Sequence, residues 1–282
     1  MTGLAEPGAR EDAPLGRADT GTHVRAVKRR YSMLNRWWRR PPPPAVDSRL
    51  WLQVLHRHRR LQRLSAEQQE VLRQFAGRFL AEKTISVTHD FQLSPLRAAL
   101  LASVACLPVL HLGFDWLQGW RELIIYPGQF RVRRHELDEH GVAHEWDDEL
   151  AGEAWEQGPV VLSWADVLAD LRRPQPGFDV VIHEIAHKID ASDGAIDGVP
   201  RLPRHRREQW IASMQTAFDQ LNALLDQGLP TPIDDYAAES PEEFFAVCSE
   251  YHFTAPQQLG AAFPAVAEQL TGFYGPSPLS TG

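Results

Sequence analysis

The segment from Val180 to Asp190 constrains this chain more than any other, because it places ionisable side chains inside an apolar run. Its central residues His183, Glu184 and His187 form the pattern H-E-x-x-H. Residues four apart lie on one face of a helix, so both imidazoles can point at one position. The surrounding Val, Ile and Ala residues make the segment apolar almost all round, which predicts a buried helix. The fold must therefore provide buried partners for two histidines and a glutamate.

A metal ion would provide those partners. Two neutral imidazoles at this spacing suit Zn²⁺, and the glutamate after the first histidine is placed to act on a metal-bound water. The alternative is a chance or structural match, since only three positions of the motif are fixed. Chance matches usually fall on polar, exposed helices, whereas this segment is apolar and lies between a Pro-Gly break and two Asp-Gly turns. We therefore expect Zn²⁺ on His183 and His187, with Glu184 as a general base.

The composition fits a globular protein with one large domain or two modest ones, since the chain has 282 residues and 43% of them are hydrophobic. The net charge of −8 argues against nucleic acid as a partner. Cys106 and Cys248 lie in apolar surroundings and form no disulfide framework, which predicts a cytoplasmic location. No apolar run reaches the length of a membrane span, so we expect no integral membrane association.

The N-terminal residues differ in composition from the rest. Residues 1–43 are rich in Gly, Ala and Arg and run into a series of prolines, which predicts a disordered basic arm. Trp37 and Trp38 lie among arginines and could contact a protein partner or anionic lipid. The favoured interpretation is a tail that covers part of the domain, or a solvated arm. We expect one folded domain over 44–274 and a flexible tail at 275–282.

The hydrophobic pattern predicts a mostly helical chain with a small sheet, an α+β fold. Ser65 and Gln68 form a capping box before one helix, and Ser-Pro pairs begin two others. Helices are expected over 47–64, 65–83, 94–111 and 204–225, in the H-E-x-x-H segment and from Ser240 onward, and strands over 84–88, 122–132 and 159–163.

A catalytic zinc site usually has three protein ligands and an open position, so one more ligand is needed. Asp193 lies six residues after His187, where an extended form of the motif places its third ligand. That form needs a glycine three residues after the second histidine, because the chain turns sharply there. Asp190 occupies that position, which disfavours Asp193.

A later helix offers two other candidates. Ser240 and Pro241 suit the N-cap and first turn of a helix, and Glu243 and Glu250 lie on one face of it. Glu243 could instead be a capping-box carboxylate. Carboxylates on a core-packed face need a counter-charge, and zinc is one. The residues alone favour Glu243 over Glu250 only slightly.

Segments along much of the chain carry a more specific resemblance: Phe79–Lys83, Ala105–Gly113, Ile125–Pro127, Gly152–Trp155, Gly158–Trp164, Val180–Asp190, Asp197–Pro200 and Glu243–Glu250. Together they resemble the Mlc titration factor A family, a group of bacterial zinc peptidases. The metal site of that family is similar to the site in the catalytic domain of anthrax lethal factor, which is of the gluzincin type. The resemblance implies a zincin-like catalytic domain.

The resemblance also implies that Glu243 is the third zinc ligand and that Tyr236, seven residues earlier, points at the substrate. Glu184 would then take a proton from the water and pass it to the leaving amine, and Tyr236 would donate a hydrogen bond to the oxyanion. The expected activity is zinc-dependent hydrolysis of a peptide or protein, with an aminopeptidase as one form of it. A packing role for Tyr236 is the alternative.

A second functional hypothesis is a regulatory protein that binds a transcriptional repressor of the Mlc type and has a mainly structural zinc. A structural site would be closed by four protein ligands, whereas the sequence offers three. Asp190 and Asp197 could orient the histidines from behind or could form turns. The strand at 160–163 could offer its edge to an extended peptide.

Overall fold

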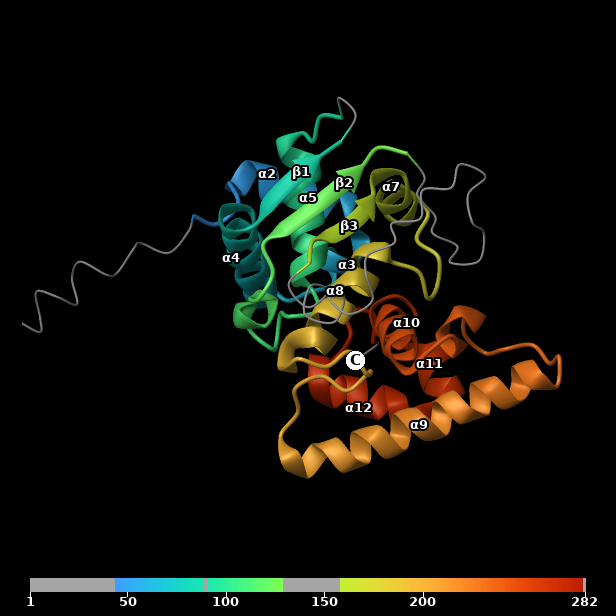
Figure 1. Cartoon of the computed structure of the whole chain (residues 1–282). Helices are drawn as coiled ribbons and strands as arrows, with labels where there is room; N and C mark the ends of the chain where they lie inside the picture. Colours follow the sequence, from blue (N-terminus) through green and yellow to red (C-terminus); the bar gives the residue numbers. More distant parts are fainter. Residues whose placement is uncertain (1–43, 89–90, 129–157, 281–282) are drawn as a thin grey trace, which may run out of the picture. The chain divides into compact units, whose positions relative to one another are not determined.

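The computed structural model describes residues 44–88, 91–128 and 158–280 (Figure 1). The predicted N-terminal arm at 1–43 lies outside the described residues, as do the expected strand residues 129–132. In the described ranges, helices predominate and the strands form one small sheet, which confirms the α+β class.

The first part of the described chain supplies the sheet and several helices around it. The predicted capping box is present, because the Gln68 N–H donates to Ser65 Oγ at 3.1 Å and the Ser65 N–H donates to Gln68 Oε1 at 2.9 Å. The elements are α2 (Ser48–Arg57), α3 (Arg59–Gln62), α4 (Ala66–Glu82), β1 (Thr84–Val87), α5 (Pro95–Cys106), η1 (Phe114–Leu117), β2 (Glu122–Tyr126), β3 (Val160–Ser163) and α7 (Trp164–Arg172).

The described strands form a sheet of order β1-β2-β3 in which neighbouring strands are parallel. Side chains alternate along a strand, so Leu123 and Ile125 of β2 share one face with Val160 and Leu162 of β3. All four are buried, which places this face of the sheet in the core. β3 leads directly into α7, and α8 packs against both.

α8 (Val180–Asp190) carries the H-E-x-x-H motif and packs against α5, α7 and β3 as well as α10. Figure 1 shows it in yellow between the sheet and the orange and red helices of the C-terminal part. Val181, Ile182, Ile185 and Ile189 are all buried, so the prediction of a buried helix is confirmed.

The C-terminal part consists of η2 (Ala191–Asp193), α9 (Arg204–Asp226), η3 (Asp235–Ala238), α10 (Pro241–Thr254), α11 (Pro256–Ala262) and α12 (Pro264–Tyr274). α10 is buried from Glu243 to Phe253 and packs against α8, α9, η3, α11 and α12. Trp210 of α9 is fully buried and contacts the rings of Phe245 and Phe273, with centroids 5.8 Å and 5.4 Å away. α10 therefore has neighbours on every side, which fixes its position beside α8.

Some elements differ from the sequence prediction. The helix expected over 47–64 is interrupted at His58, whose extended backbone (φ −124°, ψ 94°) separates α2 from α3. The prediction over 94–111 was too long, because α5 ends at Cys106 and turns follow. α7, α11 and α12 were not predicted, although Pro256 and Pro264 stand at the favoured first position of two of them.

Residues 275–280 of the expected tail contact the rest of the domain. Gly275 has a φ of +82° and lies against the ring of His111. The Gln257 side-chain amide donates to the Leu279 carbonyl at 3.0 Å. As to membranes, no helix within the described ranges combines the length and apolar character needed to cross a bilayer.

Candidate metal centre

The two motif histidines lie on one face of α8. Asp179 caps this helix by accepting the Ile182 N–H at 3.2 Å on its side chain, and regular helical geometry follows through the motif. His183 is buried and His187 is half-buried. Their Nε2 atoms are 3.1 Å apart, so both imidazoles point at one position, as the four-residue spacing predicts.

α10 brings a carboxylate to the same position. The Glu243 N–H donates to Ser240 Oγ at 3.3 Å, and Pro241 occupies the first turn. Glu243 is only 4% exposed. Its Oε2 lies 3.1 Å from Nε2 of His183 and 3.4 Å from Nε2 of His187. Among the residues that the structure describes, these three side chains form the group that could hold a metal ion.

The donor set and its spacing fit a tetrahedral metal. Zinc bonds of about 2.0–2.1 Å would place ligand atoms about 3.3–3.4 Å apart. The three separations among Glu243, His183 and His187 are 3.1, 3.1 and 3.4 Å, close to those edges. A buried carboxylate between two imidazoles also needs positive charge, which a cation supplies. The three side chains could therefore hold a metal ion.

Glu250 lies behind the metal position rather than at it. Its Oε1 is 2.8 Å from Nδ1 of His183, and its Oε2 accepts the Asp179 N–H at 2.5 Å. A carboxylate at Nδ1 favours the imidazole tautomer whose Nε2 lone pair is available to a metal. Burial raises the pKa of the Glu250 carboxyl well above its usual range, and the charge of Asp179 raises it further. A cation at the opposite nitrogen of His183 would favour the ionised carboxylate.

Asp193, the short-range candidate for the third ligand, lies elsewhere. It ends η2, and its carboxylate is 3.8 Å from the Arg207 guanidinium and accepts the Ala195 N–H at 3.4 Å. Gly194 then turns the chain with a left-handed φ of 95°. Among the described residues, the group that could hold a metal ion does not include Asp193.

Asp190 and Asp197 shape the loop after α8. The Gly198 N–H donates to the fully buried Asp190 carboxylate at 2.8 Å, and the Val199 N–H donates to Asp197 at 3.0 Å. Both observations agree with turn formation, the second of the two interpretations considered for these aspartates. Burial raises the pKa of Asp190 to about 7.

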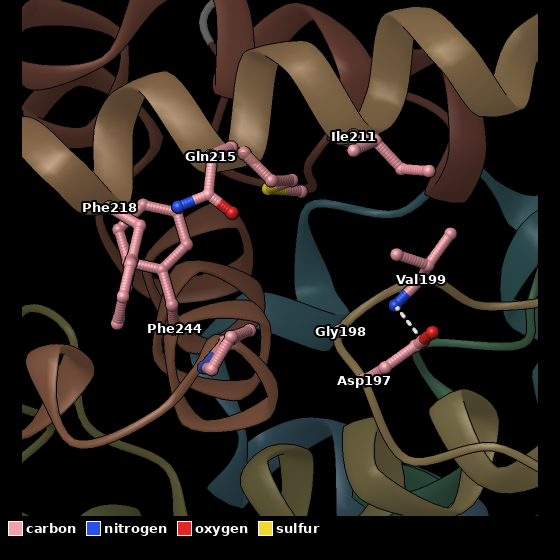
Figure 2. Close-up of a pocket in the computed structure, with 9 residues that line it drawn as sticks. Asp197, Gly198, Val199, Ile211, Gln215, Phe218 and Phe244 are labelled. Carbon is pink, nitrogen blue, oxygen red and sulfur yellow. Dashed lines mark hydrogen bonds between the residues drawn. The ribbon is translucent and has the colours of Figure 1, made fainter.

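This loop packs against the beginning of α10. Gly198 has a φ of +76°, and a Cβ added there would lie 2.5 Å from the Pro241 carbonyl oxygen. The indole N–H of Trp210 donates to the Gly198 carbonyl at 3.0 Å. A mostly apolar pocket of about 220 Å³ is lined by residues of α9, the loop and the beginning of α10. Figure 2 shows Phe244, the neighbour of Glu243, on its wall. The loop therefore packs against the first turn of α10, two residues before Glu243.

The other two predicted site residues lie close to the histidines. Glu184 is half-buried on α8, between them in the sequence. η3 carries Tyr236, whose N–H donates to the Asp234 side chain at 3.0 Å. The Tyr236 ring is half-buried, and its centroid is 6.1 Å from that of His183. Contacts thus join four of the five predicted site residues, and the fifth, Glu184, lies on the same helix as the two histidines.

Sequence reasoning missed the residues that lie behind the candidate metal ligands. Glu250 was considered only as a competing ligand, although its place two turns after Glu243 in an apolar helix could have suggested a partner for a histidine. Asp179 had the signal of an N-cap before an apolar run. Arg60, whose guanidinium is paired with Asp179, had no such signal, because the break at His58 orients it.

Comparison with known proteins agrees with this geometry. The family described as glucose-regulated metallo-peptidase M90 matches residues 34–275. Mlc titration factor A of Klebsiella pneumoniae (strain 342) is 39% identical over 222 residues, which are 78% of this chain and 83% of that protein. The protein of the same name from Escherichia fergusonii is 36% identical over 250 residues, covering 86% and 91% of the two chains. A third, from Enterobacter sp. (strain 638), is 37% identical over 219 residues, covering 77% and 82%. The chain therefore belongs to the glucose-regulated metallo-peptidase M90 family.

Proposed function

We propose that this protein is a zinc-dependent peptidase in which His183, His187 and Glu243 hold the metal. One observation carries the proposal. Three candidate ligand atoms, contributed by the helices α8 and α10, lie 3.1–3.4 Å from one another. Two imidazoles and one carboxylate are a ligand set of hydrolytic zinc sites, which keep one position open. Membership of a metallopeptidase family supports the same activity.

The residues around the site suit peptide hydrolysis. A zinc ion held there would lower the pKa of a water molecule and polarise the substrate carbonyl. Glu184 accepts the proton of the attacking water and then gives it to the leaving amine nitrogen, because it directly follows the proposed ligand His183 on α8. The Tyr236 hydroxyl donates a hydrogen bond to the substrate carbonyl oxygen as negative charge develops on that oxygen. Its ring lies beside His183, which supports this role.

Replacing Glu184 tests the proposal. Glu184→Gln keeps the shape of the side chain but removes its ability to accept a proton. We expect the variant to keep zinc and its melting temperature, while kcat for a chromogenic peptide falls by about 10²–10⁴-fold. Glu208→Gln, the same change on the exposed face of α9, is the matched control and should hydrolyse the peptide like the unmodified protein. Wild-type rates in Glu184→Gln, or no zinc in the purified protein, would contradict the proposal.

We propose an aminopeptidase as the form of this activity to test first. A peptide with a free N-terminal amine and the same peptide with an acetylated terminus separate the two forms. An aminopeptidase cleaves only the free peptide, and an endopeptidase cleaves both.

The name of the relatives, Mlc titration factor A, favours a second function, which is binding of a repressor of the Mlc type. In that case zinc would be mainly structural. Repressor binding by the unmodified protein, together with no hydrolysis of the chromogenic peptide, would favour this second function over the peptidase. We also propose a cytoplasmic location, which suits the two free, buried thiols of Cys106 and Cys248.

A further inference from the structure

The beginning of α8 rests on a buried ion pair that the proposed chemistry does not use. The Arg60 guanidinium on α3 donates to Oδ2 of Asp179, and the two side chains are 8% and 3% exposed. Figure 1 shows α3 beside α8, although 119 residues separate the two partners in sequence. Desolvation offsets much of the attraction within such a pair, so its main effect need not be on stability.

An unbroken series of contacts joins this pair to the metal position. Asp179 caps α8 with its side chain and donates its backbone N–H to Glu250 at 2.5 Å. Glu250 then meets Nδ1 of His183 at 2.8 Å. The other nitrogen of the same imidazole lies 3.1 Å from Glu243. Two residues, Asp179 and Glu250, therefore connect Arg60 to the proposed metal ligand His183.

We propose that Arg60 is a positioning residue of the metal centre. By holding the Asp179 carboxylate, it keeps the Asp179 N–H and Glu250 in line, and so fixes the direction of the Nε2 lone pair of His183. Without the guanidinium, a buried carboxylate would lose its counter-charge beside a second carboxylate, and the two would separate. The inference rests on the proposed function in one respect, which is that a metal ion binds at His183.

Zinc affinity of the full chain, measured by competition with a chromophoric chelator, tests the inference. Arg60→Met should raise the zinc dissociation constant about tenfold or more, within the range typical of partners behind a metal ligand. Arg60→Met with Asp179→Asn keeps a cap at α8 but removes both charges, so it remains informative if the single variant does not fold. We expect this double variant to melt above Arg60→Met in the metal-free state while its zinc affinity stays weak. Wild-type affinity in it would overturn the inference.

A second comparison tests the route through Glu250. If Arg60 acts through Glu250, Arg60→Met should change zinc affinity less than twofold when Glu250→Gln is already present. A full tenfold effect in that background would overturn the inference. Arg73→Met is the control, because Arg73 also pairs with an acid and bonds a distant carbonyl, but on α4 away from the site. It should leave zinc affinity unchanged. A wild-type protein that binds no zinc would refute the proposed function instead.

Discussion

At the scale of single residues, three carboxylates near α8 have different relations to the metal position. Glu243 contacts both histidine Nε2 atoms, Glu250 contacts only the far nitrogen of His183, and Asp193 lies beside Arg207. We expect zinc affinity to fall most in Glu243→Ala, by about 10–100-fold in Glu250→Ala, and not at all in Asp193→Ala. Titration of each folded variant with zinc measures the order. A loss in Asp193→Ala with none in Glu243→Ala would refute the assignment of ligands.

The buried carboxylate of Asp190 should make stability depend on pH. Burial raises its pKa in the folded protein to about 7 from a usual value of 3.8. The folded state therefore binds more protons than the unfolded state between these values, and the free energy of unfolding falls as pH rises through them. Asp190→Asn keeps an acceptor for the Gly198 N–H but does not titrate.

We expect the unmodified protein to lose stability relative to Asp190→Asn between about pH 5 and about pH 8, by at most about 1.4 kcal/mol per pH unit. Urea unfolding of both proteins at the two pH values measures the difference. Burial also lowers the pKa of His58 and His252 to about 4. These two histidines therefore make the free energy of unfolding rise with pH, the opposite of the effect of Asp190. Both histidines are present in the two proteins, so their contribution cancels in the difference between the two unfolding free energies. An unchanged difference across this range would contradict the prediction.

At the scale of elements, Gly198 links α8 to α10. An alanine there would have both an unfavourable positive φ and a Cβ 2.5 Å from the Pro241 carbonyl. Gly228 is a matched control, because its φ is +65° and a Cβ there would contact nothing within 4 Å. Gly228→Ala should cost about 1–2 kcal/mol of unfolding free energy. Gly198→Ala should cost more and also weaken zinc binding, because the start of α10 must move. Equal losses in both, with zinc affinity retained, would show that the loop does not position Glu243.

The elements also show what sequence could predict. Where a local signal exists, such as the Ser65 capping box or the apolar run around His183, the expected helix is present. The break at His58 has no glycine or proline to mark it, and it depends on tertiary packing. The convergence of His183 and His187 follows from helical spacing. The position of Glu243 relative to them does not, because it depends on how α10 packs against α8. The residues alone favoured Glu243 only slightly, and the family resemblance supplied most of the preference.

At the scale of the whole molecule, the described core begins immediately after the predicted arm. The Val46 N–H donates to the Arg73 carbonyl at 3.2 Å, and Gly77 of α4 lies so close to Pro44 that a Cβ there would be 2.2 Å from its carbonyl oxygen. Residues 1–43 contain little periodic apolar sequence. We therefore expect a chain that begins at residue 44 to fold and to bind zinc.

Two truncations make this prediction specific. Deletion of residues 1–33 leaves the whole segment that matches the family, residues 34–275, in place. Deletion of residues 1–43 also removes ten matched residues, which include Trp37 and Trp38. Both should melt within about 2–4 °C of the full chain, the shift that 1 kcal/mol causes in a domain of this size. A large drop in the longer truncation alone would mean that residues 34–43 stabilise the domain. Retained stability with altered peptide hydrolysis would instead assign these residues to substrate access, because the close contact between Pro44 and Gly77 would still be present.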